Sequence, residues 1–190
     1  AMFNEKFGMI SANAKEYLDA VTSGNEDMLS QMAGDADKYL AEIQSAFNDM
    51  SVAEQAVFYA TYGEINGVTD GWLDYTKGSY EDALIKHSAM LEQINNNENL
   101  TYDEKLKRID EEKEAFKTAQ DEKLTKLNET IANMEKEEWQ SEEDKYRALQ
   151  PYYEQRNQLI ADMEEYQLGS IDTVEKAVTE SAKAQEDAYD

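Results

Sequence analysis

The 190-residue sequence contains no cysteine, one proline and eight glycines. Without cysteine, the chain cannot form disulfides, thiolate nucleophiles or cysteine-ligated zinc sites, and the compartment stays open because both oxidising and reducing environments suit such a chain. Seven glycines lie at or before Gly78, the eighth is Gly169, and the proline is Pro151. Because glycine and proline are the residues that end helices for backbone reasons, the glycine-free stretch 79–168 predicts long uninterrupted helices.

Basic residues and long apolar runs are also scarce. The chain has 18 Lys and Arg against 42 Asp and Glu, a net charge of −24, and a mean hydropathy of −0.82. Clustered positive charge is needed to bind phosphates or anionic lipid, so we expect neither a nucleic acid nor a membrane surface as a partner. The longest strongly apolar stretch, Ala56 to Ala60, is far shorter than the roughly 20 residues of a membrane span. No leader sequence is visible, and we expect the chain to be a fragment of a longer protein.

What the sequence does contain is helical patterning, in two parts. The 41% hydrophobic content permits a thin core, which favours an all-α fold. In residues 1–98 we expect a small helical bundle, with a capping box at Ser51 and Glu54 and glycine stops at Gly24 and Gly63. Its expected helices are 11–22, 25–48, 51–62 and 69–96. The polar run 95–99 has turn-favouring residues and no apolar anchor, so it predicts the boundary between the two parts.

Residues 101–168 are predicted to form a long antiparallel helical hairpin. Thr101 and Glu104 make a second capping box, Ser141 and Asp144 restart a helix, and the Trp139 corner between the arms predicts a tight reversal. Apolar residues at three- and four-residue spacings predict a packing seam, with one inserted four-residue step in the first arm. The seam residues are Leu106, Ile109, Phe116, Leu124, Leu127, Ile131 and Met134 in the first arm, and Tyr146, Leu149, Tyr153, Arg156, Ile160 and Met163 in the second. Heptads do not specify the partner, so a dimeric coiled coil is the alternative.

Two further expectations concern the second arm and the end of the chain. Pro151 predicts a kink near Leu149 or a helix that restarts with Pro151 in its first turn. Beyond Gly169, residues 170–190 are expected to form a weakly apolar terminal helix. On the outer faces, Glu122 with Lys126 and Glu143 with Arg147 are expected to pair one turn apart, as solvated helices do.

No pattern of residues predicts catalysis. The abundant carboxylates, such as Asp110, Glu111, Glu112, Glu114 and Glu138, are expected on wet helix faces, where their pKa values are not tuned for acid–base work. His87 is the only histidine and falls on an apolar stripe, so it is expected to be a packing residue. One histidine cannot supply the two Glu-x-x-His pairs of a di-metal bundle site.

Two other sets of residues have both a structural and a functional interpretation. The run from Asp35 to Tyr39 looks like the start of a calcium loop, but Leu40 and Ala46 stand where that loop needs glycine and glutamate. Gly63, Gly67 and Gly71 favour a polar connecting loop. Aromatic residues flank this loop at helical spacing, which usually indicates core, and an exposed contact patch is the alternative that makes them candidate interaction residues. They are Phe58, Tyr59, Tyr62, Trp72, Tyr75 and Tyr80.

The second half also resembles a known family in its texture. The runs TYDEKLKRIDEEKEAFKTAQDEKLTKLNETI and YYEQRNQLIADMEEY resemble the alternating Glu/Lys helical segments of phage tail tape measure proteins of Gram-positive hosts. The resemblance implies a virion component that fills the tail tube, helps to set its length and assembles with tail-tube and chaperone proteins. It would place the chain in the virion or the host cytoplasm.

We therefore expect a non-enzymatic helical scaffold segment that binds protein partners or itself. No cofactor, metal or small-molecule substrate is expected. The rival hypothesis is a secreted or cell-surface helical binding module, an adhesin or effector, that uses an aromatic patch near Tyr62 and Trp72. An enzyme with a pocket around His87 is the remaining alternative.

Overall fold

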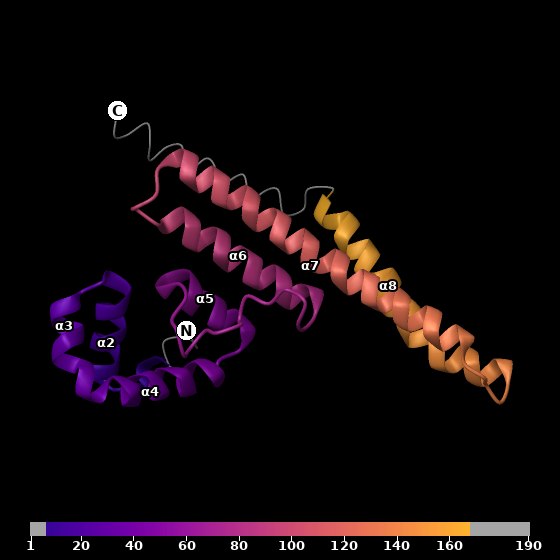
Figure 1. Ribbon diagram of the computed structural model, residues 1–190, viewed down its shortest axis with the longest axis horizontal. Coiled ribbons are helices and arrows are strands. Elements are labelled where there is room, and N and C mark those ends of the chain that lie inside the picture. The colour runs from indigo at the N-terminus through magenta and orange to yellow at the C-terminus, as the bar shows by residue number, and fades with distance from the viewer. Residues whose placement is uncertain (1–6, 168–190) are drawn as a thin grey trace. The chain divides into compact units, whose positions relative to one another are not determined.

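The computed structural model describes residues 7–167, and all the regular structure in that range is helical, as the sequence predicts (Figure 1). The elements in chain order are α2 (Ala12–Ser23), α3 (Glu26–Met32), the short 3-10 helix η1 (Ala33–Asp35), α4 (Ala36–Asn48), α5 (Val52–Tyr62), α6 (Tyr80–Asn96), α7 (Tyr102–Lys136) and α8 (Glu142–Gln167). The predicted terminal helix 170–190 lies outside the described residues.

The chain divides into two compact units. The first comprises Ala1–Asp74 and Leu84–Asn99, and the second comprises Tyr75–Ala83 and Leu100–Asp190. The division after Asn99 lies at the end of the polar run in which the sequence predicts a boundary. The second unit also includes the segment that leads into α6, which the sequence predicts to be part of the bundle.

Local sequence signals account for most helix ends in the first unit. The Ser51 side chain accepts a hydrogen bond from the Glu54 amide, and the Glu54 side chain accepts one from the Ser51 amide, which is the predicted capping box. Gly24 ends α2 in the left-handed conformation, at φ 66°, where a side chain would be strained. Ser11 starts α2 because its side chain accepts from the amide of Ala14.

Two predicted helices of the first unit are wrong in extent. The predicted helix 25–48 is interrupted by η1, which contains Gly34, a residue that weakens helices through its backbone entropy. The predicted helix 69–96 begins only at Tyr80. The residues before it form turns, because Gly71 and Gly78 have φ values of 68° and 78° that no helix accommodates.

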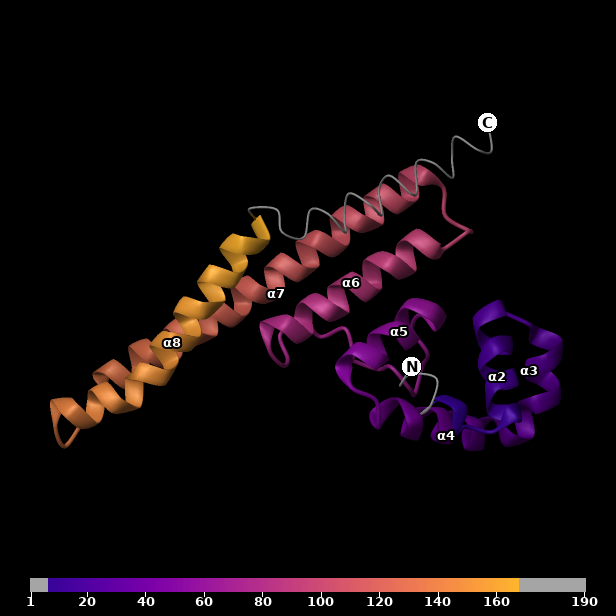
Figure 2. The same ribbon diagram turned by 180° about the vertical axis from the view of Figure 1, so that it is seen from behind.

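The core of the first unit is aromatic. The ring of Trp72 stacks on Tyr59 with centroids 5.0 Å apart, and the ring of Phe47 meets Phe58 edge-on at 5.2 Å. The indole Nε1 of Trp72 donates to Oε1 of Gln55 at 2.9 Å, so the polar end of this large side chain is satisfied inside the core. Around these rings α2 packs beside α3 and α4, forming the small bundle that the sequence predicts (Figure 2).

The second unit contains the predicted antiparallel hairpin. Helix α7 has 35 residues and α8 has 26, and they lie side by side in both views (Figure 1, Figure 2). The capping box of Thr101 with Glu104 starts α7, and the Ser141 hydroxyl accepts from the Asp144 amide where α8 starts. Between the arms, Nε1 of Trp139 donates to the carbonyl of Met134 at 2.9 Å, which fixes the reversal. The prediction of a hairpin is confirmed.

Pro151 does not start a helix. Helix α8 begins at Glu142, nine residues earlier, and continues through Pro151 to Gln167, so the predicted restart is wrong. The Pro151 ring is on the exposed side of α8, where the carbonyl that loses its amide partner can bond to water.

Replacing the cap residue of α7 tests this account of the hairpin. Thr101→Ala is expected to lower the free energy of unfolding of the second unit by about 1 kcal/mol, because the amides at the start of α7 lose their acceptor. Urea denaturation followed by circular dichroism measures the change. The matched control is Thr125→Ala in the exposed middle of the same helix, where alanine has the higher helix propensity and no loss is expected. Equal losses in both variants would contradict the capping role.

Candidate functional site on the helical hairpin

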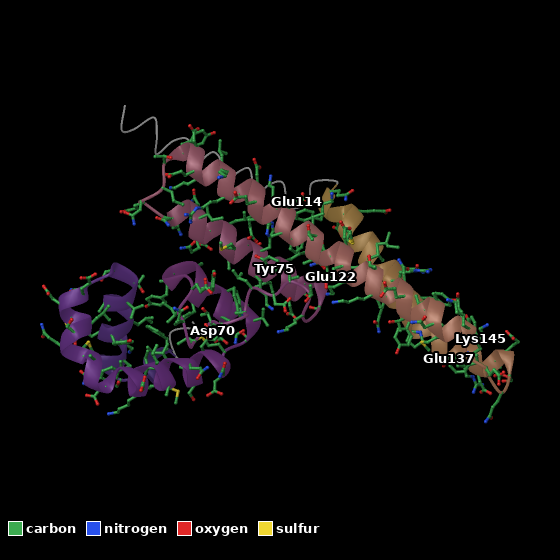
Figure 3. All side chains as sticks on the ribbon, in the orientation of Figure 1. Asp70, Tyr75, Glu114, Glu122, Glu137 and Lys145 are labelled. Atoms are coloured by element: carbon green, nitrogen blue, oxygen red, sulfur yellow. The ribbon has the colours of Figure 1, made fainter. Side chains whose placement is uncertain are left out.

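The segment before α6 is anchored on α7 through Tyr75 (Figure 3). The Tyr75 hydroxyl donates to a carboxylate oxygen of Glu112, and Nε2 of Gln120 donates to the Tyr75 carbonyl at 3.1 Å. Tyr75, Glu112 and Gln120 are all buried, with 6%, 8% and 1% of their surfaces exposed. This position of Glu112 corrects the expectation that it lies on an outer helix face.

Phe116 is the centre of an aromatic cluster in the second unit. Its ring is 1% exposed and meets the rings of Tyr75, Tyr80 and Tyr166 at centroid distances of 5.5, 5.9 and 5.1 Å. Tyr75 and Tyr80 come from the segment around the start of α6, and Tyr166 comes from the last turn of α8. One side chain therefore holds three separate stretches of the unit together.

Tyr80 has an unusual electrostatic environment. Its hydroxyl is buried and has no hydrogen-bond partner in the described part of the chain. Burial, reinforced by the carboxylate of Asp162 and then by that of Glu165, raises the pKa of Tyr80 to about 12 from its ordinary value of 10.0. The phenol therefore stays neutral through the physiological range.

A cavity of about 520 Å³ adjoins this cluster within the second unit. Apolar parts of its wall come from Tyr80, Leu127 and Leu159, and charged groups come from Lys123, Glu154 and Asp162. Its volume falls in the range of small-molecule sites, roughly 300–1,000 Å³. Nothing in the sequence signalled this cavity, because its walls come from three stretches that are far apart along the chain.

Hydrogen bonds fix the polar groups around the cavity. Lys123 Nζ donates to the Gly78 carbonyl at 3.0 Å. On α8, Nε2 of Gln158 donates to Oδ1 of Asp162 at 2.8 Å, and Nε2 of Gln150 donates to Oε1 of Glu154 at 3.0 Å. Each carboxylate is thus oriented by an uncharged amide four residues earlier on the same helix.

The aromatic residues that flank the glycine-containing loop are mostly core residues, as their helical spacing favoured. Phe58, Tyr59 and Trp72 are buried in the first unit and Tyr75 in the second, while Tyr62 and Tyr80 are partly buried. The ring of Tyr62 stacks on Phe7 and tilts against Phe58. The burial of four of the six side chains favours the core interpretation over an exposed patch.

The predicted seam residues divide into three groups. Ile109, Phe116, Ile131 and Leu149 are buried. Partly buried members are Leu106, Leu124, Leu127, Met134, Tyr153, Arg156, Ile160 and Met163. Tyr146 is 63% exposed and lies off the packed face, whereas Leu159, which the prediction omitted, is 6% exposed. The packed face of α8 is therefore turned by one residue from the predicted one at these positions.

The structure also places the histidine and the candidate metal ligands. His87 is completely buried in α6. Among residues 7–167 no group of three or more metal-ligating side chains comes together. None of the helices in that range combines the length and the apolar character needed to cross a membrane.

The fold and the site define an all-α protein with a bundle and a hairpin. Comparison of the chain with protein-family models, with curated proteins and with solved structures found no match.

The hydroxyl of Tyr75 provides a test of the anchor on α7. Tyr75→Phe is expected to lower the free energy of unfolding by about 1–3 kcal/mol, because the buried Glu112 carboxylate loses a hydrogen bond inside the protein. Urea denaturation measures this change in the free energy of unfolding. Tyr146→Phe removes the same hydroxyl from an exposed site and should change stability by less than about 0.5 kcal/mol. A Tyr75 variant as stable as the Tyr146 variant would show that the bond is not needed.

The pKa of Tyr80 predicts a loss of stability at high pH. In the unfolded chain the phenol ionises near 10.0, whereas in the folded protein it keeps its proton until about 12. The folded state therefore binds more protons between these values, and its stability falls as the pH rises through this window. Burial and Asp19 raise the pKa of Tyr62, and a hydrogen bond to Glu135 raises that of Tyr153, so both act in the same direction.

The contribution of Tyr80 is isolated by comparison with Tyr80→Phe. The variant should be as stable as the parent at neutral pH, because no hydrogen bond is lost, and should lose less stability between pH 10 and 12. Alkaline unfolding curves of the two proteins, followed by circular dichroism, measure the difference. Superimposable curves would mean that Tyr80 is not the group responsible.

Proposed function

We propose that this chain is a non-enzymatic scaffold segment, in which the hairpin of α7 and α8 works as a stiff spacer between protein partners. The proposal extends to the role that the sequence resemblance implies, a segment of a phage tail tape measure protein. The observation that carries it is the hairpin itself, two long helices packed along one face. At 1.5 Å per residue, the 35 residues of α7 extend about 50 Å.

The surface of the hairpin supports this role because its charged side chains are exposed. Lys126 pairs with Glu122 at 2.6 Å, Lys107 with Glu111 at 3.7 Å, and Arg147 with Glu143, each one helical turn apart. Exposed carboxylates such as Glu114 and Glu122 mark the outer face of α7 (Figure 3). Such pairs stabilise the individual helices by about 0.2–0.5 kcal/mol each, so the arms stay helical with only a thin core between them.

Anchoring at the end of α8 supports stiffness. The contact of Tyr166 with Phe116 fixes the last turn of α8 against the middle of α7, and Trp139 fixes the reversal at the other end. The hairpin is therefore held at both ends of α8. The rival hypothesis of an adhesin or effector relied on an exposed aromatic patch, and of those residues four are buried and Tyr62 and Tyr80 are partly buried.

Mass spectrometry of purified virions tests the proposal. After induction of the host culture, peptides from residues 102–167 are expected in the tail fraction of density-purified particles, at a low and constant number of copies per particle. Uninduced cells and culture supernatant are the controls. Peptides in the cell envelope or supernatant but absent from particles would contradict the proposal.

Tail length gives a second, quantitative readout. An in-frame deletion of residues 102–167 is expected to shorten the tail by about 50 Å if the arms stay folded together, or by about 100 Å if they extend as one helix. Electron micrographs of the particles measure the shortening. The substitution Glu114→Gln, on an exposed face, should leave the length unchanged, and tails of normal length in the deletion strain would refute the spacer role.

A further inference from the structure

The cavity beside α8 combines apolar walls with a net negative charge. Among its lining residues, two carboxylates, Glu154 and Asp162, face one lysine, Lys123. Within residues 7–167 neither carboxylate takes part in an ion pair, and the ammonium of Lys123 bonds to the carbonyl of Gly78. The cavity thus has an excess of one negative charge.

The two carboxylates are held in position for an incoming cation. They lie eight residues apart on one face of α8, about 12 Å along the helix, so a cation pairs with one of them at a time. Each accepts a hydrogen bond from a glutamine amide through one oxygen. An amide donor is neutral, so it orients a carboxylate without neutralising its charge. A carboxylate has room for up to about four hydrogen bonds, which leaves acceptor capacity on both groups.

The neighbouring walls favour an apolar group. Leu159 is 6% exposed, and Leu127 and the partly buried ring of Tyr80 also line the cavity. The carboxylates of Asp162 and Glu165 both act on the Tyr80 hydroxyl, so the electrostatic potential there is negative. A ligand that fits this combination has a cationic end and an apolar body, and an aromatic face such as that of Tyr80 also attracts cations.

We propose that this cavity binds a small organic ammonium ion with an apolar body, whose ammonium group pairs with Asp162, the partly buried carboxylate of the lining. The site is independent of the scaffold role, because it requires only the second unit to be folded. It also departs from the expectation, drawn from the sequence, that the chain has no small-molecule ligand.

The test uses the intact chain and three probes in calorimetric titrations. The probe 2-phenylethylammonium carries both features, 2-phenylethanol lacks the charge, and methylammonium lacks the apolar body. Binding is expected for 2-phenylethylammonium, at least about fivefold tighter than for either of the others, which corresponds to one partly screened ion pair. Amide NMR shifts are expected at Gly78, Ser79 and Lys123, which lie along the cavity.

Matched double variants locate the site. Glu154→Gln with Asp162→Asn should weaken binding of 2-phenylethylammonium about tenfold and leave the circular dichroism spectrum unchanged. Glu114→Gln with Glu129→Gln makes the same change in net charge at exposed positions of α7 outside the cavity, and should weaken binding by less than about twofold.

Several outcomes would overturn the proposal. They are no binding of 2-phenylethylammonium at millimolar concentration, equal binding of the alcohol, an equal effect of the two double variants, and NMR shifts elsewhere in the chain. If the cavity variants unfold, the Tyr80→Phe variant provides a second comparison, because it keeps both carboxylates and should retain the preference for the charged probe over the alcohol.

Discussion

The second unit depends on the packing of three tyrosine rings around Phe116. A two-helix hairpin has only one buried face, so it lacks the interior that fixes side chains in a globular core. Phe116 compensates because its ring contacts Tyr75 and Tyr80, which precede α7 in the chain, and Tyr166, which follows it on α8. Without that contact, the segment before α6 and the end of α8 would each lose their main apolar anchor on α7.

The same cluster explains why polar groups are buried in so acidic a protein. Glu112 and Gln120 lie one turn on either side of Phe116 on α7, and both bond to Tyr75. Burying a carboxylate without a partner would cost the folded state free energy. A hydrogen bond from a phenol replaces part of the hydration that the carboxylate loses. Aromatic contacts and directional hydrogen bonds at Tyr75 therefore fix the segment before α6 in one position on α7.

The features that the sequence predicted correctly are those that depend on neighbours along the chain. The capping boxes at Ser51 and Thr101 need only residues three apart. The prediction chose Ile160 rather than the more deeply buried Leu159 because the two are adjacent apolar residues between which spacing cannot choose. The burial of Glu112 and the cavity depend on partners far along the chain, for which the sequence has no local signal.

The heptad spacing of the hairpin also constrains how its length can change. Seven residues return a seam to the same face and add about 10 Å of helix, while other insertions turn the apolar side chains away from the partner arm. A change in one arm must be matched in the other, because Tyr166 of α8 pairs with Phe116 of α7 at a fixed level. The length of the hairpin can therefore change only in steps of about seven residues that are made in both arms.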